Sequence, residues 1–143
     1  MSDLTIRHAM REDLPALGEI VFAWEQRTEW MQSENDAAEI GRFIETAFDE
    51  RIILVVGDPA IAYLAFDPER HRIGGLYSLV SDKGIGKALM DKIKEGRDFL
   101  WLNTHEPNRA AQKFYKREGF EEVSNEGAEP ANGVPELRME WRR

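Results

Sequence analysis

The sequence predicts one α+β domain, with helices and strands in the order β-α-α-β-β-β-α-β-α-β-β. Two observations favour a single unit: the chain has 143 residues, and it contains neither an internal repeat nor a low-complexity linker. An apolar content of 42% is sufficient for a hydrophobic core. We therefore expect residues 1–143 to form one domain.

The first third of the chain predicts a strand followed by two helices. Residues 4–8 alternate apolar and polar side chains, as a short strand does. Asp13 stands where the N-cap of a helix belongs, and a second helix is expected over residues 37–48, after a connector at 26–33. The apolar residues at helical spacing are Leu14, Leu17, Val21 and Trp24 in the first helix, and Ala37, Ile40, Ile44 and Phe48 in the second.

The middle of the chain predicts three strands. Apolar runs at 52–56 and 61–66 are separated by a Gly-Asp-Pro turn, and a third strand is expected over residues 73–79. The pair Gly74 and Gly75 is unusual within a strand. Either a β-bulge or the close approach of a substrate or cofactor would explain it.

The rest of the chain predicts two helices and three strands. The expected helices cover residues 84–95, ended by Gly96, and residues 108–118, with Asn108 as N-cap and Gly119 at the end. The expected strands cover residues 99–103, 120–123 and 137–141, and a loop rich in Gly, Pro and Asn is expected over residues 127–135. Residues 137–141 alternate apolar and charged side chains, which is typical of a strand with one buried face.

Charge is segregated along the chain. The net charge is -8, yet residues 83–117 hold nine basic and four acidic side chains and have a net charge of +5, whereas residues 1–50 have a net charge of -8. Because an acidic protein repels a polyanion, we expect no nucleic-acid partner. The basic block could still attract a small anion.

The composition also excludes several kinds of site. The chain has no Cys, and its three His residues lack metal-ligand spacing, so we expect neither a disulfide nor a metal. The first ten residues lack the features of a secretory signal, and no apolar run is long enough to span a membrane. We therefore expect a cytoplasmic protein without a membrane partner.

A glycine-bearing turn between a strand and a helix is the most informative segment. Gly84 and Gly86 open the helix, so free backbone N–H groups and the positive end of the helix dipole point at one spot. Lys83 and Lys87 add positive charge beside it. This arrangement predicts a phosphate-binding site.

The spacing excludes two common phosphate loops. A nucleoside-triphosphate loop that ended at Gly86 and Lys87 would need Gly at position 81 and a hydroxyl at position 88, where the sequence has Ser81 and Ala88. A dinucleotide fingerprint starting at Gly84 would need Gly or Ala at position 89, which is Leu89.

The same turn resembles a hallmark of the GNAT superfamily of N-acetyltransferases, R/Q-x-x-G-x-G/A, with Gly84 and Gly86 at its glycine positions. Residues 108–120, NRAAQKFYKREGF, are similar to the family's N-x-x-A-x-x-F/Y-Y-x-x-x-G-F signature, and residues 6–17 resemble its first strand and helix. The resemblance covers most of the chain. It implies a GNAT-like fold, with a mixed, mostly antiparallel sheet of about seven strands flanked by about four helices.

The resemblance also implies an activity: transfer of an acetyl group from acetyl-CoA to a primary amine of a small molecule or peptide, by direct attack in a ternary complex. It places the cofactor where the fourth and fifth strands splay apart. The implied cofactor-binding residues are Lys83, Gly84, Ile85, Gly86 and Lys87 around the pyrophosphate, Leu79 and Val80 beside the pantetheine arm, and Asn108 and Tyr115 on its other side. Tyr115 is the candidate catalytic residue, since a phenol with a pKa of about 10 can protonate the departing thiolate. Core packing is the alternative explanation for Tyr115.

The base and the acceptor are less defined by the sequence. A water chain or any of several loop residues could accept the proton of the amine: Glu29, Asp67, Glu69, His71, His105 or Glu106. In this fold the first two helices and their connector cover the acceptor pocket. Here they bring aromatic faces and carboxylates, which suit a cationic amine: Trp24, Glu25, Glu29, Trp30 and Glu34, of which Trp24, Glu29 and Trp30 are the candidate acceptor-binding residues. We therefore expect the acceptor to be a small polyamine-like or aminoglycoside-like amine, or a Lys or N-terminal amine of a peptide. Core packing of both tryptophans is the alternative.

One departure from the family pattern keeps a second function open. Ser81 stands where the family usually has Arg or Gln, and the segment before Gly84 is about two residues shorter than usual. A non-catalytic acyl-CoA-binding regulatory module of the same fold is therefore the alternative. We expect a monomer or a homodimer, the latter by pairing of residues 137–141 as an exposed end strand.

Overall fold

A computed structural model describes residues 5–31, 34–81, 83–123 and 134–143. It confirms the predicted order of elements. The strands are β1 (Ile6–His8), β2 (Ile52–Gly57), β3 (Ala60–Asp67), β4 (Arg72–Ser78), β5 (Phe99–His105), β6 (Glu121–Val123) and β7 (Glu136–Arg142). The helices are α1 (Leu14–Gln26), α2 (Ala37–Glu45), α3 (Ile85–Lys94) and α4 (Arg109–Arg117), with short 3-10 turns η1 (Arg11–Asp13) and η2 (Phe48–Glu50).

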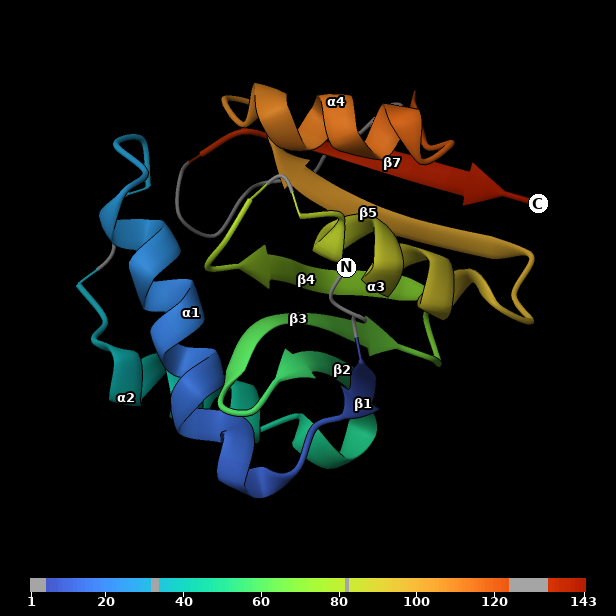
Figure 1. Ribbon diagram of the computed structural model, residues 1–143. Helices are drawn as coiled ribbons and strands as arrows, with labels where there is room; N and C mark the ends of the chain where they lie inside the picture. The colour runs from blue at the N-terminus through green and yellow to red at the C-terminus, as the bar shows by residue number, and fades with distance from the viewer. Residues whose placement is uncertain (1–4, 32–33, 82, 124–133) are drawn as a thin grey trace.

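The strands form one mixed sheet in the order β1-β2-β3-β4-β5-β7-β6 (Figure 1). All neighbours are antiparallel except β4 and β5, which are parallel. The expected mixed, mostly antiparallel sheet is thus confirmed. The expectation that residues 137–141 form an end strand is wrong, because β7 pairs with β5 on one side and with β6 on the other. Within the described residues the edge strands are β1 and β6.

The helices cover both faces of the sheet. Successive residues of β2 alternate between two hydrophobic clusters, because side chains along a strand point to opposite faces. Ile53 and Val55 pack with α1 and α2, whereas Leu54 and Val56 pack in the cluster that contains α3 and Tyr115 of α4. In Figure 1, α1 and α2 lie together at the left, away from α3 and α4.

A β-bulge shapes the centre of the sheet. Ala65 pairs with Gly75 and Phe66 pairs with Ile73, so Gly74 is the extra residue of β4. This confirms the bulge as the explanation for one of the two adjacent glycines. Pairing between β4 and β5 is limited to Arg72 with Trp101 and Ile73 with Leu102. Beyond the bulge the two strands diverge toward their C-terminal ends (Figure 1), and the sheet opens between them.

Most helix boundaries follow the predicted signals. Asn108 caps α4, since its side chain accepts a hydrogen bond from the Ala111 N–H at 3.1 Å, and Gly96 and Gly119 adopt positive φ angles of 73° and 96° after α3 and α4. The second helix ends at Glu45, earlier than expected, and η2 follows it. Position 4 of the first predicted strand and most of the predicted loop 127–135 lie outside the described residues.

Asp13 has a different role from the predicted one. Its carboxylate makes no capping bond to α1. It accepts two hydrogen bonds from the Arg7 guanidinium, at 2.7 and 2.8 Å, and one from the Met10 N–H at 2.7 Å. The hydrogen bonds from Arg7 hold the pKa of Asp13 below its usual value. This partly buried ion pair ties β1 to the start of α1.

Candidate functional site

A cavity of about 700 Å³ lies between the end of β4, the turn before α3, and the facing sides of α3 and α4; we call it the α3–α4 cavity. Most of the predicted cofactor-binding residues line it, although the chain segments that carry them are far apart in sequence. They are Val80, Lys83, Gly84, Ile85, Gly86, Lys87, Asn108 and Tyr115. Leu79 does not line this cavity, and its N–H donates to the Ile61 carbonyl at 2.9 Å.

The N-terminus of α3 faces this cavity with free donors. The N–H groups of the first turn have no partner within a helix, and no described side chain caps this one. Gly84 takes a left-handed conformation with φ of 73°, and a Cβ there would meet no atom within 4 Å. Together with the helix dipole, these N–H groups form a site suited to a phosphate.

Gly86 lies close to a side chain of α4. A Cβ at this position would lie 3.3 Å from Cζ of Phe114 in α4, so the aromatic ring occupies the space that a side chain would need. The missing side chain therefore leaves room for the Phe114 ring beside the start of α3. This contact of Gly86 with Phe114 was not predicted from the sequence.

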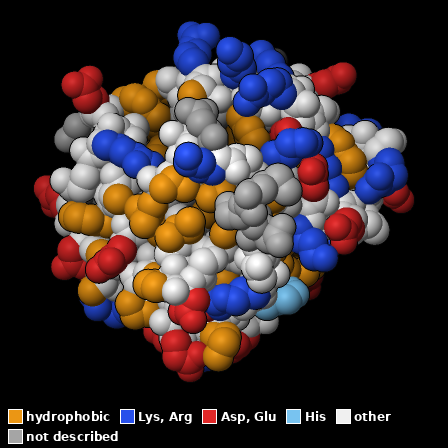
Figure 2. All heavy atoms as spheres, viewed as in Figure 1, with side chains coloured by type: hydrophobic (Ala, Val, Ile, Leu, Met, Phe, Trp, Pro, Cys, Tyr) orange, Lys and Arg blue, Asp and Glu red, His pale blue; other side chains and the backbone are white. Residues whose placement is uncertain are grey.

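Basic side chains surround the α3–α4 cavity. Lys83, Lys87 and Arg117 line it. Figure 2 shows Lys and Arg side chains gathered over the upper part of the molecule, where α4 lies. Sequence reasoning missed Glu118, whose buried carboxylate lies 3.6 Å from Nζ of Lys87 and 3.8 Å from Nζ of Lys94. Nothing in the sequence distinguishes this glutamate from a solvent-exposed residue at a helix end.

Tyr115 projects from α4 into the core beside the cavity. Its ring is buried and packs against Phe114 and Phe120, with centroid distances of 5.4 and 5.7 Å. Burial, and secondarily the neighbouring Tyr77, raise the pKa of the Tyr115 phenol above its usual value of 10.0. The hydroxyl is therefore protonated at neutral pH and can donate a proton or a hydrogen bond. The alternative of core packing describes the surroundings of Tyr115, and the same side chain also lines the α3–α4 cavity; its role in catalysis stays a prediction.

A smaller cavity of about 120 Å³ occupies the opening of the sheet; we call it the β4–β5 cavity. Tyr115 and Asn108 line it from the α4 side, and His105 lines it from the end of β5. Side chains along a strand alternate between the two faces of a sheet. Leu102 of β5 is buried in the cluster that contains α3, so Asn103 and His105 face the side of α1 and α2. The β4–β5 cavity therefore connects the two faces of the sheet.

Among the candidate bases, only His105 lines either of these cavities within the described residues. Asp67 forms ion pairs with Arg70 at 3.0 Å and with Arg51 at 3.6 Å, at the far end of β3. The remaining candidates, Glu29, Glu69, His71 and Glu106, are exposed.

His105 is held in an aromatic and acidic environment. Its ring lies 6.1 Å from Trp24 and 5.1 Å from Trp30, measured between centroids, and its Nε2 lies 3.9 Å from a carboxylate oxygen of Glu136. Burial lowers the pKa of His105 below its usual 6.5, against the opposite effect of Glu136. The imidazole is consequently neutral at neutral pH and can accept a proton.

Of the predicted acceptor residues, Trp24 alone lines either of these two cavities among the described residues. Trp24 lines both cavities and contacts Tyr77 at 5.4 Å and Trp30 at 5.6 Å between centroids. Trp30 packs behind Trp24 and lines neither cavity, and Glu29 is exposed. The sequence did not single out Tyr77, which faces the same opening from β4.

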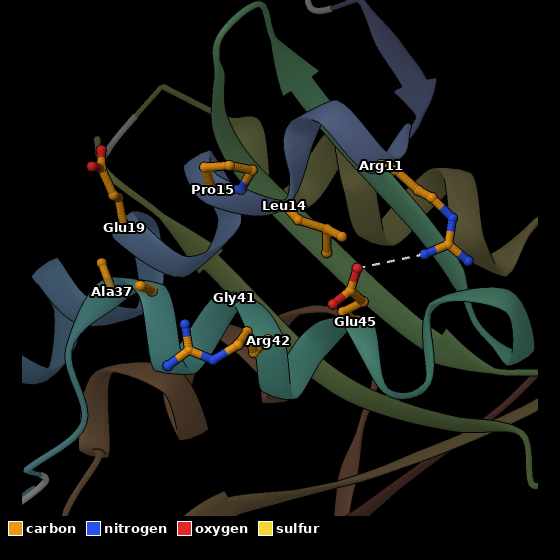
Figure 3. A pocket seen from close by; sticks show the side chains of 9 residues that line it. Arg11, Leu14, Pro15, Glu19, Ala37, Gly41, Arg42 and Glu45 are labelled. Atoms are coloured by element: carbon orange, nitrogen blue, oxygen red, sulfur yellow. Dashed lines mark ion pairs between the residues drawn. The ribbon is translucent and has the colours of Figure 1, made fainter.

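Another cavity, of about 420 Å³, lies at the outer side of α1 and α2 (Figure 3). Arg11 and Glu45 form an ion pair of 3.7 Å at its edge, and none of the predicted site residues lines it. Among the described residues no group of three His, Asp or Glu side chains could hold a metal ion. Within the same part of the chain, no helix is long and apolar enough to cross a membrane.

Known proteins share the sequence pattern and the fold of this chain. The profile of the Acetyltransferase (GNAT) family matches residues 6–120. No curated protein matches the chain by sequence. Three of the similar solved structures are apo YjaB from Escherichia coli (19% identity, 98% of both chains, TM-score 0.77), PaiA N-acetyltransferase from Thermoplasma acidophilum in complex with coenzyme A (22%, 99% of this chain and 100% of that one, 0.77), and YncA from Salmonella typhimurium with acetyl-CoA (19%, 99% and 94%, 0.72). At these identities the structures establish a common fold.

Proposed function

The chain belongs to the acetyltransferase (GNAT) family, and on that basis we propose that it transfers an acetyl group from acetyl-CoA to a primary amine of a small molecule or peptide. The observation that supports this most directly is the continuous lining of the two cavities. They share Tyr115, Asn108 and Trp24, and together they lead from the uncapped start of α3 through the opening of the sheet to His105.

The residues of the α3–α4 cavity fit the cofactor. The free N–H groups at the start of α3 and the ammonium groups of Lys83 and Lys87 would hold the pyrophosphate. Val80 lines the cavity and would lie beside the pantetheine arm; it is 40% exposed, which is high for a large apolar side chain. Solved structures of YncA and PaiA contain acetyl-CoA and coenzyme A.

Two side chains on opposite sides of the β4–β5 cavity would move the protons. Acetyl-CoA supplies an acetyl group activated as a thioester. As the amine nitrogen forms its bond to the carbonyl carbon and the carbon–sulfur bond breaks, the nitrogen loses one proton and the thiolate gains one. His105, neutral because of its burial, would accept the first proton, and Tyr115 would donate the second. Water would restore both groups.

Binding and turnover test this proposal separately. Acetyl-CoA should raise the melting temperature, because a ligand that prefers the native state stabilises it. Release of free thiol from acetyl-CoA should then depend on an added amine. Absence of a thermal shift at millimolar acetyl-CoA would contradict the proposed cofactor. A thermal shift without turnover of any amine would favour the non-catalytic acyl-CoA-binding module.

The cytoplasmic location, the single domain and the choice between monomer and homodimer remain predictions. The sequence suggested a dimer formed by pairing of residues 137–141 as an edge strand. These residues lie inside the sheet, between β5 and β6, so that argument no longer applies.

A further inference from the structure

A groove of about 660 Å³ lies between α1, α2 and the sheet; we call it the Glu25 groove. Glu25 lines it from α1, Phe43 from α2, and Tyr63 from β3. Gly74 and Tyr77 of β4 line both this groove and the β4–β5 cavity, so the two spaces meet at these residues. None of the predicted cofactor-binding residues lines the groove.

Glu25 is incompletely satisfied. Its Oε1 is buried and makes no hydrogen bond in the structure of the described residues. Glu25 and Tyr77 line this groove together, and burial, followed by the charge of Glu25, raises the pKa of Tyr77 to about 12. A carboxylate oxygen that is removed from water and has no partner costs free energy. A cation or a hydrogen-bond donor bound beside Glu25 would recover part of that cost.

The other charged side chains of the groove do not supply that partner. The carboxylate of Glu39 accepts a hydrogen bond from the Asp36 N–H at 3.2 Å, as part of the cap of α2. Arg42 is exposed and lines the outer α1–α2 cavity as well (Figure 3). Glu25 is therefore the charged residue of this groove that a bound cation would satisfy.

We propose that the Glu25 groove binds a second ammonium group of the acceptor, which makes the preferred acceptor a diamine. This inference rests on the proposed function. The reacting nitrogen must be neutral to attack, whereas an ammonium beside a carboxylate is favoured in its charged form, so the two nitrogens need different places. The rings of Tyr63 and Tyr77 offer faces for the cation, and Phe43, which is 79% exposed, offers apolar surface for the intervening methylene groups.

A matched pair of amines tests the inference. Putrescine carries two amines on four carbons, and butylamine lacks the second amine. We expect the wild-type protein to have a kcat/KM for putrescine about tenfold or more above that for butylamine, with most of the difference in KM. Titration without acetyl-CoA should show the same preference in Kd.

The substitution Glu25→Gln keeps the shape of the side chain and removes its charge. It should abolish the preference for putrescine in both KM and Kd while leaving butylamine kinetics unchanged. Glu19→Gln is the control, because Glu19 is an exposed carboxylate on the same helix and points away from α2 (Figure 3). Without ligand, Glu25→Gln should melt close to the wild-type temperature, since Oε1 of Glu25 makes no hydrogen bond among the described residues; a purely structural Glu25 would give a lower value.

The outcomes distinguish this inference from the proposed function. Equal Kd values for the two amines, or an unchanged preference in Glu25→Gln, would overturn the diamine site even if butylamine is acetylated. A protein that binds neither coenzyme nor amine would overturn both.

Discussion

Replacement of Tyr115 by Phe tests the chemistry most sharply. The substitution removes one oxygen and keeps the ring, so the contacts with Phe114 and Phe120 remain. The free energy of unfolding should therefore change by less than about 1.5 kcal/mol. The affinity for coenzyme A should also be retained, because the start of α3 and its lysines are untouched.

The rate should fall much more. In the wild-type protein the raised pKa of Tyr115 keeps a proton available beside the α3–α4 cavity. Without the hydroxyl, the developing thiolate would lose its donor in a buried place. Loss of such a general acid lowers kcat by about 100- to 10,000-fold, which corresponds to about 3–5 kcal/mol in activation free energy.

The measurement is steady-state release of free thiol from acetyl-CoA with a saturating amine, together with titration of coenzyme A. A kcat reduced by less than about threefold, with unchanged coenzyme affinity, would show that Tyr115 is not the proton donor. A variant that no longer binds coenzyme A would show that the hydroxyl serves binding instead.

Three further predictions follow from the same structure. His105 must be neutral to accept a proton, so kcat/KM should fall as the pH drops through its lowered pKa, below the usual 6.5, and His105→Gln should remove this acidic limb of the pH profile. Asp13→Asn should lower the free energy of unfolding by about 2 kcal/mol at neutral pH, as measured by denaturant titration, because the hydrogen bonds from the Arg7 guanidinium lose their charged acceptor. The pKa of Asp13 is lower in the folded than in the unfolded state, so this contribution to stability should be present above the unfolded-state pKa and disappear as the pH falls through the folded-state pKa. A difference in unfolding free energy between wild type and variant that is equal at neutral pH and below the folded-state pKa would contradict this. Lys83→Gln should weaken coenzyme A binding, more at low than at high ionic strength; an effect independent of salt would argue against a charge contact.

The local signals in the sequence were sufficient for the order of elements and for one side of the site. Helix caps such as Asn108 and helix stops such as Gly96 act through neighbouring backbone groups, so they can be identified without knowledge of the fold. The same holds for the start of α3, where Gly84 and the free N–H groups belong to one short segment. The family signature added the expectation that Tyr115 approaches this segment, and both line one cavity.

Errors arose where the sequence signal is the same for two arrangements. An alternating pattern at residues 137–141 shows that one face is buried, yet it carries no information on how many strands flank it. Similarly, an Asp before a helix can cap it or pair with a distant cation, and Arg7 decides in favour of the pair.

The sequence by itself determined the elements, their order and the glycine turn that we propose as the anion site, because each depends on residues within one or two helical turns of one another. The tertiary structure decided which side chains share a cavity. The bulge at Gly74 opens the sheet, and that opening brings His105 of β5 to the same cavity as Tyr115 of α4. The packing of α1 on the sheet also brings Glu25 and Tyr77 of β4 to one groove. Such contacts join segments far apart in the chain, so they arise only when the sheet and both helical layers pack together.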